Sequence, residues 1–163
     1  MPVISVTGGV YVETCLDPEW QMIFGSGGRA AAGLAALVES VQLHTYASKN
    51  MTPEVVALAE TSGFKLNLHP SSQTISFDYL HCLSNPLVSP HPTQIHEHPA
   101  MEVEADVVLR FGFMEGDARV KGEWVVYDPQ SPLDPRPFSK NGSSANHLAI
   151  VAKILQRPEY RNA

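Results

Sequence analysis

A glycine-rich turn that leads directly into a run of small residues constrains the fold of this chain more than any other stretch. Residues 25–37 read GSGGRAAAGLAAL, and an apolar stripe at steps of three and four predicts a helix that runs to about residue 40. The stripe consists of Leu34, Leu37, Val38 and Val41. Alanine has a high helix propensity and little bulk, so this helix can lie close against a sheet.

Gly27 and Gly28 stand at the start of that helix, where they leave the backbone open to a ligand. The free N–H groups of the first turn and the positive end of the helix dipole would then face the bound group. A flexible loop ahead of an ordinary alanine-rich helix accounts for the same residues equally well. The stretch alone therefore leaves a binding role and a structural role open.

The bulk composition restricts both the fold and the function. With 163 residues the chain has the size of one domain, so we expect residues 1–163 to form a single domain. Charged residues make up 17%, below the ~25% typical of soluble domains, which indicates extensive burial or a surface that awaits a partner. The net charge is −6 and no Lys/Arg cluster is present, which argues against nucleic-acid binding.

Cysteine usage and hydropathy predict a cytoplasmic protein that does not interact with a membrane. Cys15 and Cys82 are the only cysteines, which fits a reducing compartment, and we expect both as small buried residues. The start, MPVISVTGG, lacks a basic region ahead of an apolar run and does not read as a signal peptide. No apolar run approaches the ~20 residues of a membrane span.

The first part of the chain alternates between strand and helix patterns. Strands are predicted at residues 3–6, 10–14, 41–46 and 64–68, helices at 25–40 and 52–62, and a turn at 16–18. Thr52 is predicted as the N-cap of the second helix, with Pro53 at its first position and Gly63 at its end. Helices that alternate with strands predict a mainly parallel sheet covered on both faces.

The second part of the chain is richer in strands and loops. Residues 74–81 alternate strictly between apolar and polar and predict a strand with one covered face. The Pro- and His-rich residues 84–99 predict a loop. Further strands are predicted at residues 103–113 and 123–127, with a hairpin turn at Gly116 and Asp117 between them, and residues 148–152 predict a last strand or helix.

The order of these parts resembles the ribokinase-like (PfkB-type) carbohydrate and nucleoside kinases. The resemblance rests on a first strand, an acidic residue soon after it, the Gly27-Gly28 pair and the alternation of strands and helices. The segment VVYDPQSP at residues 125–132 resembles the family's strand that ends in an Asp-Pro-Asn turn, and LAIVA before Lys153 resembles its next strand. The match covers nearly the whole chain but only the N-terminal half of a typical member. It implies an incomplete ribokinase-like α/β fold, with helices flanking a mainly parallel sheet and a small β lid.

The resemblance also implies a set of substrate-binding residues. In this family a Gly-Gly pair and an early acidic residue hold the hydroxyls of a sugar or nucleoside, and these positions fall on Gly27, Gly28 and either Glu13 or Asp17. A carboxylate suits this work because it accepts two hydroxyl hydrogen bonds at once. Glu13 is equally explained as an exposed strand residue, and Asp17 as a turn residue before proline.

Arg29 and the alternating strands extend that site. Arg29 either contacts an anionic group or caps and solvates the helix start. The strands at residues 10–14 and 74–81 resemble the family's lid, so Phe77, Tyr79 and His81 would stack on a sugar or base. Packing of the lid against the core without ligand contact is the competing explanation. The chain has Ala31 and Ala32 where the family often has an asparagine a few residues past the glycine pair, a departure that counts against the substrate assignment.

The catalytic parts of the family pattern are absent from this sequence. The family's base is an Asp in a Gly-Ala-Gly-Asp segment that opens a helix, and no such segment is present. Lys153 and Gln156 occupy the positions of an Asn-x-x-Glu motif that organises magnesium, and neither side chain suits a hard dication. The sequence therefore predicts no catalytic residue, metal site or cofactor in this chain, although ATP and magnesium are implied for a complete member.

The histidines of the predicted loop raise one further metal hypothesis. His91, His96 and His98 offer imidazole ligands, but the spacing is poor and no cysteine joins them. A solvated loop is the simpler explanation.

Two functions from different classes follow. The first is the sugar- or nucleoside-binding part of an ATP-dependent carbohydrate kinase, inactive alone because the catalytic segment is missing. The alternative is a non-catalytic interaction module that pairs with another chain, a second copy or a missing C-terminal half through an open sheet edge, as the low charged fraction suggests.

Overall fold

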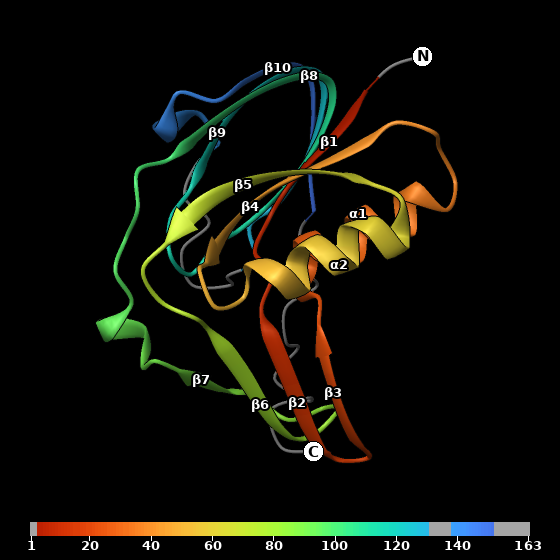
Figure 1. The fold of residues 1–163 in the computed structure, drawn as a ribbon. Coiled ribbons are helices and arrows are strands. Elements are labelled where there is room, and N and C mark those ends of the chain that lie inside the picture. Colours follow the sequence, from red (N-terminus) through yellow and green to blue (C-terminus); the bar gives the residue numbers. More distant parts are fainter. Residues whose placement is uncertain (1–2, 131–137, 152–163) are drawn as a thin grey trace.

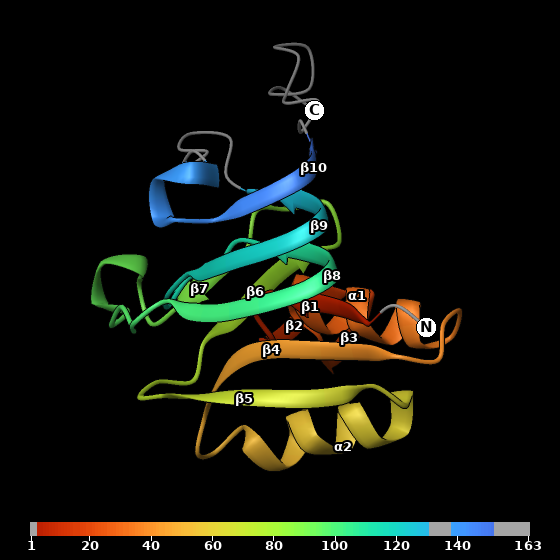
Figure 2. The same ribbon diagram turned by 90° about the horizontal axis from the view of Figure 1, so that it is seen from above.

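A parallel six-stranded sheet forms the centre of the molecule (Figures 1 and 2). The computed structural model describes residues 3–130 and 138–151. The strand order is β10-β9-β8-β1-β4-β5, and every neighbouring pair is parallel. The strands are β1 (Ile4–Thr7), β4 (Val41–Ser48), β5 (Lys65–Ser71), β8 (Met101–Phe111), β9 (Ala118–Asp128) and β10 (Ser144–Ile150).

Helices α1 (Gly25–Ala35) and α2 (Thr52–Ser62) cover one face of this sheet. The main core lies between them and the sheet, and its buried members are Val6, Val10, Ala31, Val41, Leu43, Ala47, Met51, Val55, Ala59 and Phe64. Helix α2 ends at Gly63, whose φ of 81° is the left-handed conformation that favours glycine. The predicted mainly parallel α/β sheet with flanking helices is confirmed.

Helix boundaries differ from the prediction in two places. Helix α1 ends at Ala35 instead of near residue 40, because Val41 already pairs with Ile4 in the sheet and the chain must leave the helix first. Leu37, which the predicted apolar stripe included, is therefore 81% exposed. At α2 the N-cap is Met51, and Thr52 is instead the first helical residue, with its hydroxyl donating to the carbonyl of Ser48.

The other face of the sheet is covered by its own strands. In the first half of β8 every second residue is buried up to Val103, and from Val108 onward the alternate set of positions is buried instead. Strand β9 shows the same change. The β8–β9 pairing is interrupted between these positions, at Asp106 and Glu123, and both strands run as bent arcs (Figure 1). Their first halves thus turn back over the sheet and enclose a second core. Its buried members are Tyr46, Met101, Val103, Val108, Ala118, Val120, Val125, Tyr127 and Phe138.

The bend changes how β8 connects to β9. Neighbouring parallel strands normally need a crossover of about a dozen residues or more. Here residues 112–117 suffice, because the bent strands bring the end of β8 close to the start of β9. The predicted hairpin turn at Gly116 and Asp117 is wrong, since Met101 pairs with Ala118 in a parallel ladder.

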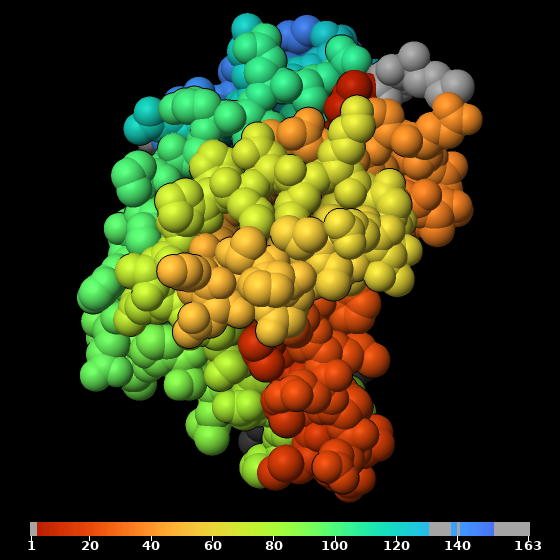
Figure 3. All heavy atoms as spheres, in the orientation of Figure 1, coloured from red at the N-terminus to blue at the C-terminus, as the bar shows by residue number. Residues whose placement is uncertain are grey.

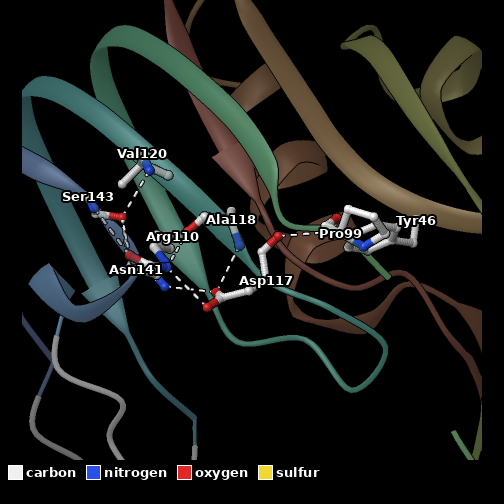
Figure 4. A network of polar contacts seen from close by, with 8 residues as sticks. All are labelled: Tyr46, Pro99, Arg110, Asp117, Ala118, Val120, Asn141 and Ser143. Carbon is white, nitrogen blue, oxygen red and sulfur yellow. Dashed lines mark hydrogen bonds and ion pairs between the residues drawn. The ribbon is translucent and has the colours of Figure 1, made fainter. Parts of the chain in front are cut away.

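A polar network fixes the folded-back halves (Figure 4). The Tyr46 hydroxyl donates to the carbonyls of Pro99 at 2.6 Å and Asp117 at 3.0 Å. The Ser143 hydroxyl accepts from Nη1 of Arg110 at 3.3 Å and from the backbone of Val120 at 3.0 Å. The Tyr46 bonds tie β4 to the residues just ahead of β8 and β9, and the Ser143 bonds tie β8 and β9 to the segment ahead of β10.

A second, four-stranded sheet projects from the body, with β2 and β3 forming the red lobe of Figure 3. Its order is β3-β2-β6-β7, with β2 (Val12–Asp17), β3 (Glu19–Ile23), β6 (Ser76–His81) and β7 (Leu87–Ser89). The small sheet was predicted from β2 and β6. Strand β3 was not predicted, although its short sequence EWQMI alternates between polar and apolar residues up to Met22. The predicted loop at residues 84–99 also contains β7 and a short 3-10 turn, η1 (Pro92–Gln94).

Candidate functional site

The small sheet meets α1 at an ion pair between Glu13 and Arg29. Nη1 of Arg29 donates to Oε1 of Glu13 at 3.0 Å, and Nη2 contacts Oε2, so the guanidinium holds both carboxylate oxygens. The Glu13 side chain is 7% exposed, whereas that of Arg29 is 51% exposed. The interpretation of Glu13 as an exposed strand residue is therefore wrong. Two residues proposed separately from the sequence form one unit.

A cavity of about 170 Å³ opens beside this pair, and we call it the Glu13–Arg29 cavity. Its lining residues are Glu13, Trp20, Arg29, Tyr79 and Cys82. The rings of Trp20 and Tyr79 lie with centroids 6.3 Å apart. Burial raises the pKa of the Tyr79 phenol, so this hydroxyl is neutral at physiological pH and can both donate and accept. The cavity combines a carboxylate, a cation and two aromatic rings.

Both cysteines lie in the small-sheet region, in different environments. Cys15 is fully buried, as predicted, and faces the same side of β2 as Glu13. Cys82 is exposed, so the expectation of a second buried cysteine is wrong. It follows directly after β6, in the turn where Ser84 donates to the carbonyl of His81.

The other residues proposed from the small sheet lie outside this cavity. Phe77 packs on Tyr11, with ring centroids 5.0 Å apart. Asp17 is exposed at the end of β2, where it pairs in register with His81. The His81 ring accepts from the backbone of Leu83. The structure thus unites Glu13, Arg29 and Tyr79 but not the whole proposed set.

The Gly27-Gly28 pair lies in the protein interior. A Cβ on Gly27 would stand 2.4 Å from the carbonyl oxygen of Gly8, so only glycine allows α1 to approach the end of β1 this closely. The N–H of Gly27 donates to the carbonyl of Gly9 at 3.1 Å. A Cβ on Gly28 would come closest to the side chain of Leu58, at 3.3 Å. Close packing of α1 on the end of β1 explains Gly27, and Gly28 faces the side chain of Leu58 on α2; contact of either glycine with a ligand remains a prediction.

The first turn of α1 also touches the carboxyl end of β9. The Ser26 hydroxyl donates to Oε1 of Gln130 at 2.9 Å, and the backbone of Gln130 donates to the carboxylate of Asp128. The segment Asp128-Pro129-Gln130 thus lies against the helix start, near Gly112. Open α/β sheets bind ligands at the carboxyl ends of their strands, which is where β1, β8 and β9 converge here.

A buried pair that the sequence did not indicate links the small sheet to the β8–β9 connection. The Tyr11 hydroxyl donates to Oε2 of Glu115 at 2.8 Å and accepts from the backbone of Met114 at 3.0 Å. Burial raises the pKa of both Tyr11 and Glu115. Tyr11 precedes β2 and Glu115 lies in a short connection, so no local pattern marks either of them.

Some expectations concern metals, membranes and the end of the chain. In residues 3–130 and 138–151, no group of three or more His, Cys, Asp or Glu side chains is placed to hold a metal ion. His96 and His98 contact Ser72 instead. Within those ranges, neither helix has the length and hydropathy needed to cross a bilayer. Lys153 and Gln156 lie outside the described residues.

Comparison with known proteins places the fold. No family model and no curated protein matches the chain. Ribokinase from Cryptococcus neoformans var. grubii serotype A, solved with ADP, superposes with a TM-score of 0.58 at 14% identity, over 88% of this chain and 55% of that one. The structure of Sa239 superposes with a TM-score of 0.50 at 9% identity, over 80% of this chain and 62% of that one. The chain thus spans about half the length of the ribokinase. It has a ribokinase-like α/β fold, with a second small sheet.

Proposed function

We propose that this chain binds a sugar or nucleoside between its small sheet and α1, at the Glu13–Arg29 cavity. The observation that carries this proposal is a buried carboxylate that orients a half-exposed guanidinium beside the rings of Trp20 and Tyr79. Guanidinium and phenol groups recognise hydroxyls, and aromatic faces pack on the apolar face of a sugar ring or on a base.

The roles within the cavity differ between Glu13 and Arg29. A guanidinium has five N–H donors, and Glu13 engages two of its nitrogens, so donors remain for a ligand. Both Glu13 oxygens already accept from Arg29. Glu13 therefore acts mainly by fixing the guanidinium plane, and Arg29 and Tyr79 supply the polar contacts to the ligand.

We further propose that this binding unit belongs to an ATP-dependent carbohydrate kinase activity. The ribokinase that shares its fold was solved with ADP, which supports a nucleotide partner for a complete member. The described residues contain no carboxylate cluster suited to magnesium, so no phosphoryl-transfer step is assigned to them. Under this proposal, ATP and magnesium bind to parts of a complete family member other than the described residues.

Isothermal titration against pentoses, hexoses and nucleosides tests the proposal. We expect at least one compound to bind below the millimolar range, and Arg29→Ala to weaken that binding at least tenfold. Arg119→Ala is the matched control, because Arg119 forms an exposed ion pair with Glu102 on the other sheet. Absence of binding by every compound, or equal losses in both variants, would contradict the proposal.

A second function rests on the edge strand β10. In the described chain β10 is the last strand of the six-stranded sheet, and its Leu148 and Ile150 are 43% and 56% exposed, beside Trp124 at 55%. An exposed apolar edge is a template for pairing with another strand. Light scattering distinguishes this interaction module from the binding unit, because a monomer at high concentration would argue against pairing between copies.

A further inference from the structure

A cavity of about 750 Å³ lies on the helix-free face of the six-stranded sheet, separate from the Glu13–Arg29 cavity. One wall is the first half of β1 and β4, with Ser5 and His44. The other walls belong to the folded-back strands and the bend itself. The bend carries Asp106 and Glu123 at the level where strand pairing is interrupted. We call this the bend cavity, and it lies away from the carboxyl ends of the strands.

The charged groups of the bend cavity are mainly acidic. Among the described residues, three carboxylates line the cavity, those of Glu104, Asp106 and Glu123, and Lys121 is the one lysine or arginine beside them. Nζ of Lys121 pairs with Glu104 at 2.9 Å. Glu123 accepts from Asn146 and lies 3.6 Å from a ring nitrogen of His147, while Asp106 has no ion pair within the described ranges. The cavity therefore favours cations over anions.

His44 supplies an independent sign that this face takes a polar ligand. The residue is 7% exposed and lines the bend cavity, and within residues 3–130 and 138–151 its buried Nδ1 has no hydrogen-bond partner. Thr7, its neighbour in register on β1, likewise has an unpaired buried hydroxyl. Such unpaired buried groups are costly and rare in folded proteins. Burial, together with the nearby His69, lowers the pKa of His44 to about 4, so its ring is neutral at pH 7 and one nitrogen can accept a hydrogen bond.

We propose that the bend cavity binds an organic cation with several ammonium groups, of the linear polyamine class. Ammonium groups carry only donors, which complement the carboxylates at the bend and an unprotonated nitrogen of His44. A linear molecule reaches from the sheet wall to the bend, and the cavity volume falls in the range of known small-molecule sites, about 300–1,000 Å³. A compact metal ion fits less well, because no three potential ligands within the described ranges are placed to hold one.

Spermidine is the probe, titrated calorimetrically into the full chain at low and at physiological salt. We expect saturable binding of one molecule per chain that weakens with salt, as an electrostatic contact does. Asp106→Asn should weaken it at least tenfold. Glu60→Gln removes the same charge from the exposed surface of α2 and should leave the affinity unchanged. Nitrogen-15 NMR of wild-type protein adds a readout that needs no variant, since spermidine should shift the ring resonances of His44.

Three outcomes would overturn the inference. Equal weakening by Asp106→Asn and Glu60→Gln would mean diffuse attraction to a protein of net charge −6. Displacement of spermidine by equimolar Mg²⁺ would mean a general cation site. Unchanged His44 resonances at saturating spermidine would place binding elsewhere. Failure of sugars to bind at the Glu13–Arg29 cavity does not bear on this site.

Discussion

Nη2 of Arg110 donates to Oδ1 of Asp117 over 2.8 Å, and this contact joins the end of β8 to the residue just ahead of β9 (Figure 4). Arg110 is 2% exposed, and its guanidinium lies 4.5 Å from the centroid of the Tyr127 ring. Asp117 also accepts from the backbone of Ala118 and from Asn141. The pair therefore fastens the two ends of the short β8–β9 connection, which the bend of the strands makes possible.

The first prediction concerns this ion pair. Burial alone would raise the pKa of Asp117, but its hydrogen bonds with Arg110, Ala118 and Asn141 hold that pKa below its usual value. Asp117→Asn would leave the Arg110 charge buried without its partner, which typically costs ~3–5 kcal/mol. Urea unfolding should show this loss. Glu102→Gln is the control, because its exposed pair with Arg119 should be worth at most about 1 kcal/mol. A similar effect of both substitutions would contradict the buried role.

The second prediction concerns pH. The pKa of His44 falls from 6.5 to about 4 in the folded chain, through burial and through His69. The neutral His44 ring favours the folded state, and this contribution to the free energy of unfolding is complete above pH 6.5. It is lost as the pH falls from 6.5 to about 4, because the imidazole of the unfolded chain takes up a proton first. At about 1.4 kcal/mol per pKa unit, the loss is at most roughly 3–4 kcal/mol.

The free energy of unfolding, measured between pH 7 and pH 4, checks this window. Burial raises the pKa of Glu115, so protonation of this carboxyl stabilises the folded chain as the pH falls, opposite to the effect of His44. Wild-type data alone are therefore ambiguous. The comparison with His44→Gln isolates the imidazole, and that variant should lose less stability on acidification. His91→Gln, at an exposed position, should follow the wild type. If His44→Gln also followed it, the ring would not be the titrating group.

The third prediction separates two glycines of the same helix. Gly27→Ala would place a Cβ 2.4 Å from the Gly8 carbonyl oxygen, so α1 must move and we expect a loss of several kcal/mol or failure to fold. A Cβ on Gly33 would meet no atom of the described residues within 4 Å, and Gly33→Ala should stabilise the chain by about 0.5–1 kcal/mol through helix propensity. Thermal unfolding measures both. A tolerated Gly27→Ala would show that the close approach is dispensable.

Local patterns in the sequence predict the parts of this fold that depend on near neighbours. Helix α2 ends where Gly63 adopts a left-handed conformation, and the strand–helix alternation predicts the parallel core. The bend at Asp106 is different, because it appears only as a one-residue phase change within an otherwise regular strand pattern. The sequence therefore indicated strands at β8 and β9 but not their curvature or the parallel connection.

In the candidate site, too, local patterns indicated individual residues but not the contacts between them. Glu13, Arg29 and Tyr79 were proposed individually, from a family resemblance and from alternation in the strands. That Arg29 fixes both Glu13 oxygens depends on how the small sheet docks on α1, which no local pattern encodes. Tyr11 and Glu115 meet across most of the chain, and only the three-dimensional fold brings them together.

The fourth prediction tests Tyr79. If Tyr79 lines a ligand site, Tyr79→Ala should weaken sugar or nucleoside binding while leaving the thermal midpoint nearly unchanged. If the ring serves only packing, the substitution should cost up to ~3 kcal/mol, as truncation of a large buried aromatic does. Phe77→Ala is a useful comparison, because Phe77 packs on Tyr11 and does not line the cavity, so the substitution should lower stability before it lowers affinity. A stability loss without a separate affinity effect would remove Tyr79 from the proposed site.

The last prediction is that this chain by itself does not transfer phosphate. Phosphoryl transfer needs a metal clamp on the nucleotide and a base near the acceptor hydroxyl, and the sequence has no Gly-Ala-Gly-Asp segment to supply that base. Loss of an acid–base group typically costs ~100- to 10,000-fold in rate, and loss of charge-stabilising donors a further ~100- to 1,000-fold.

Coupled ADP release with magnesium, ATP and a pool of sugars and nucleosides measures this directly, using protein that ends at Ala163. We expect no substrate-dependent signal above background. Saturable release that survives repurification would contradict the prediction and would make Asp128 the first candidate base. Its carboxylate lies at the end of β9, where it accepts from the backbone of Gln130 at 2.9 Å, beside the first turn of α1. Asp128→Asn would then have to abolish the release, because the amide cannot accept the acceptor's proton, whereas Asp78→Asn on the small sheet should leave it intact.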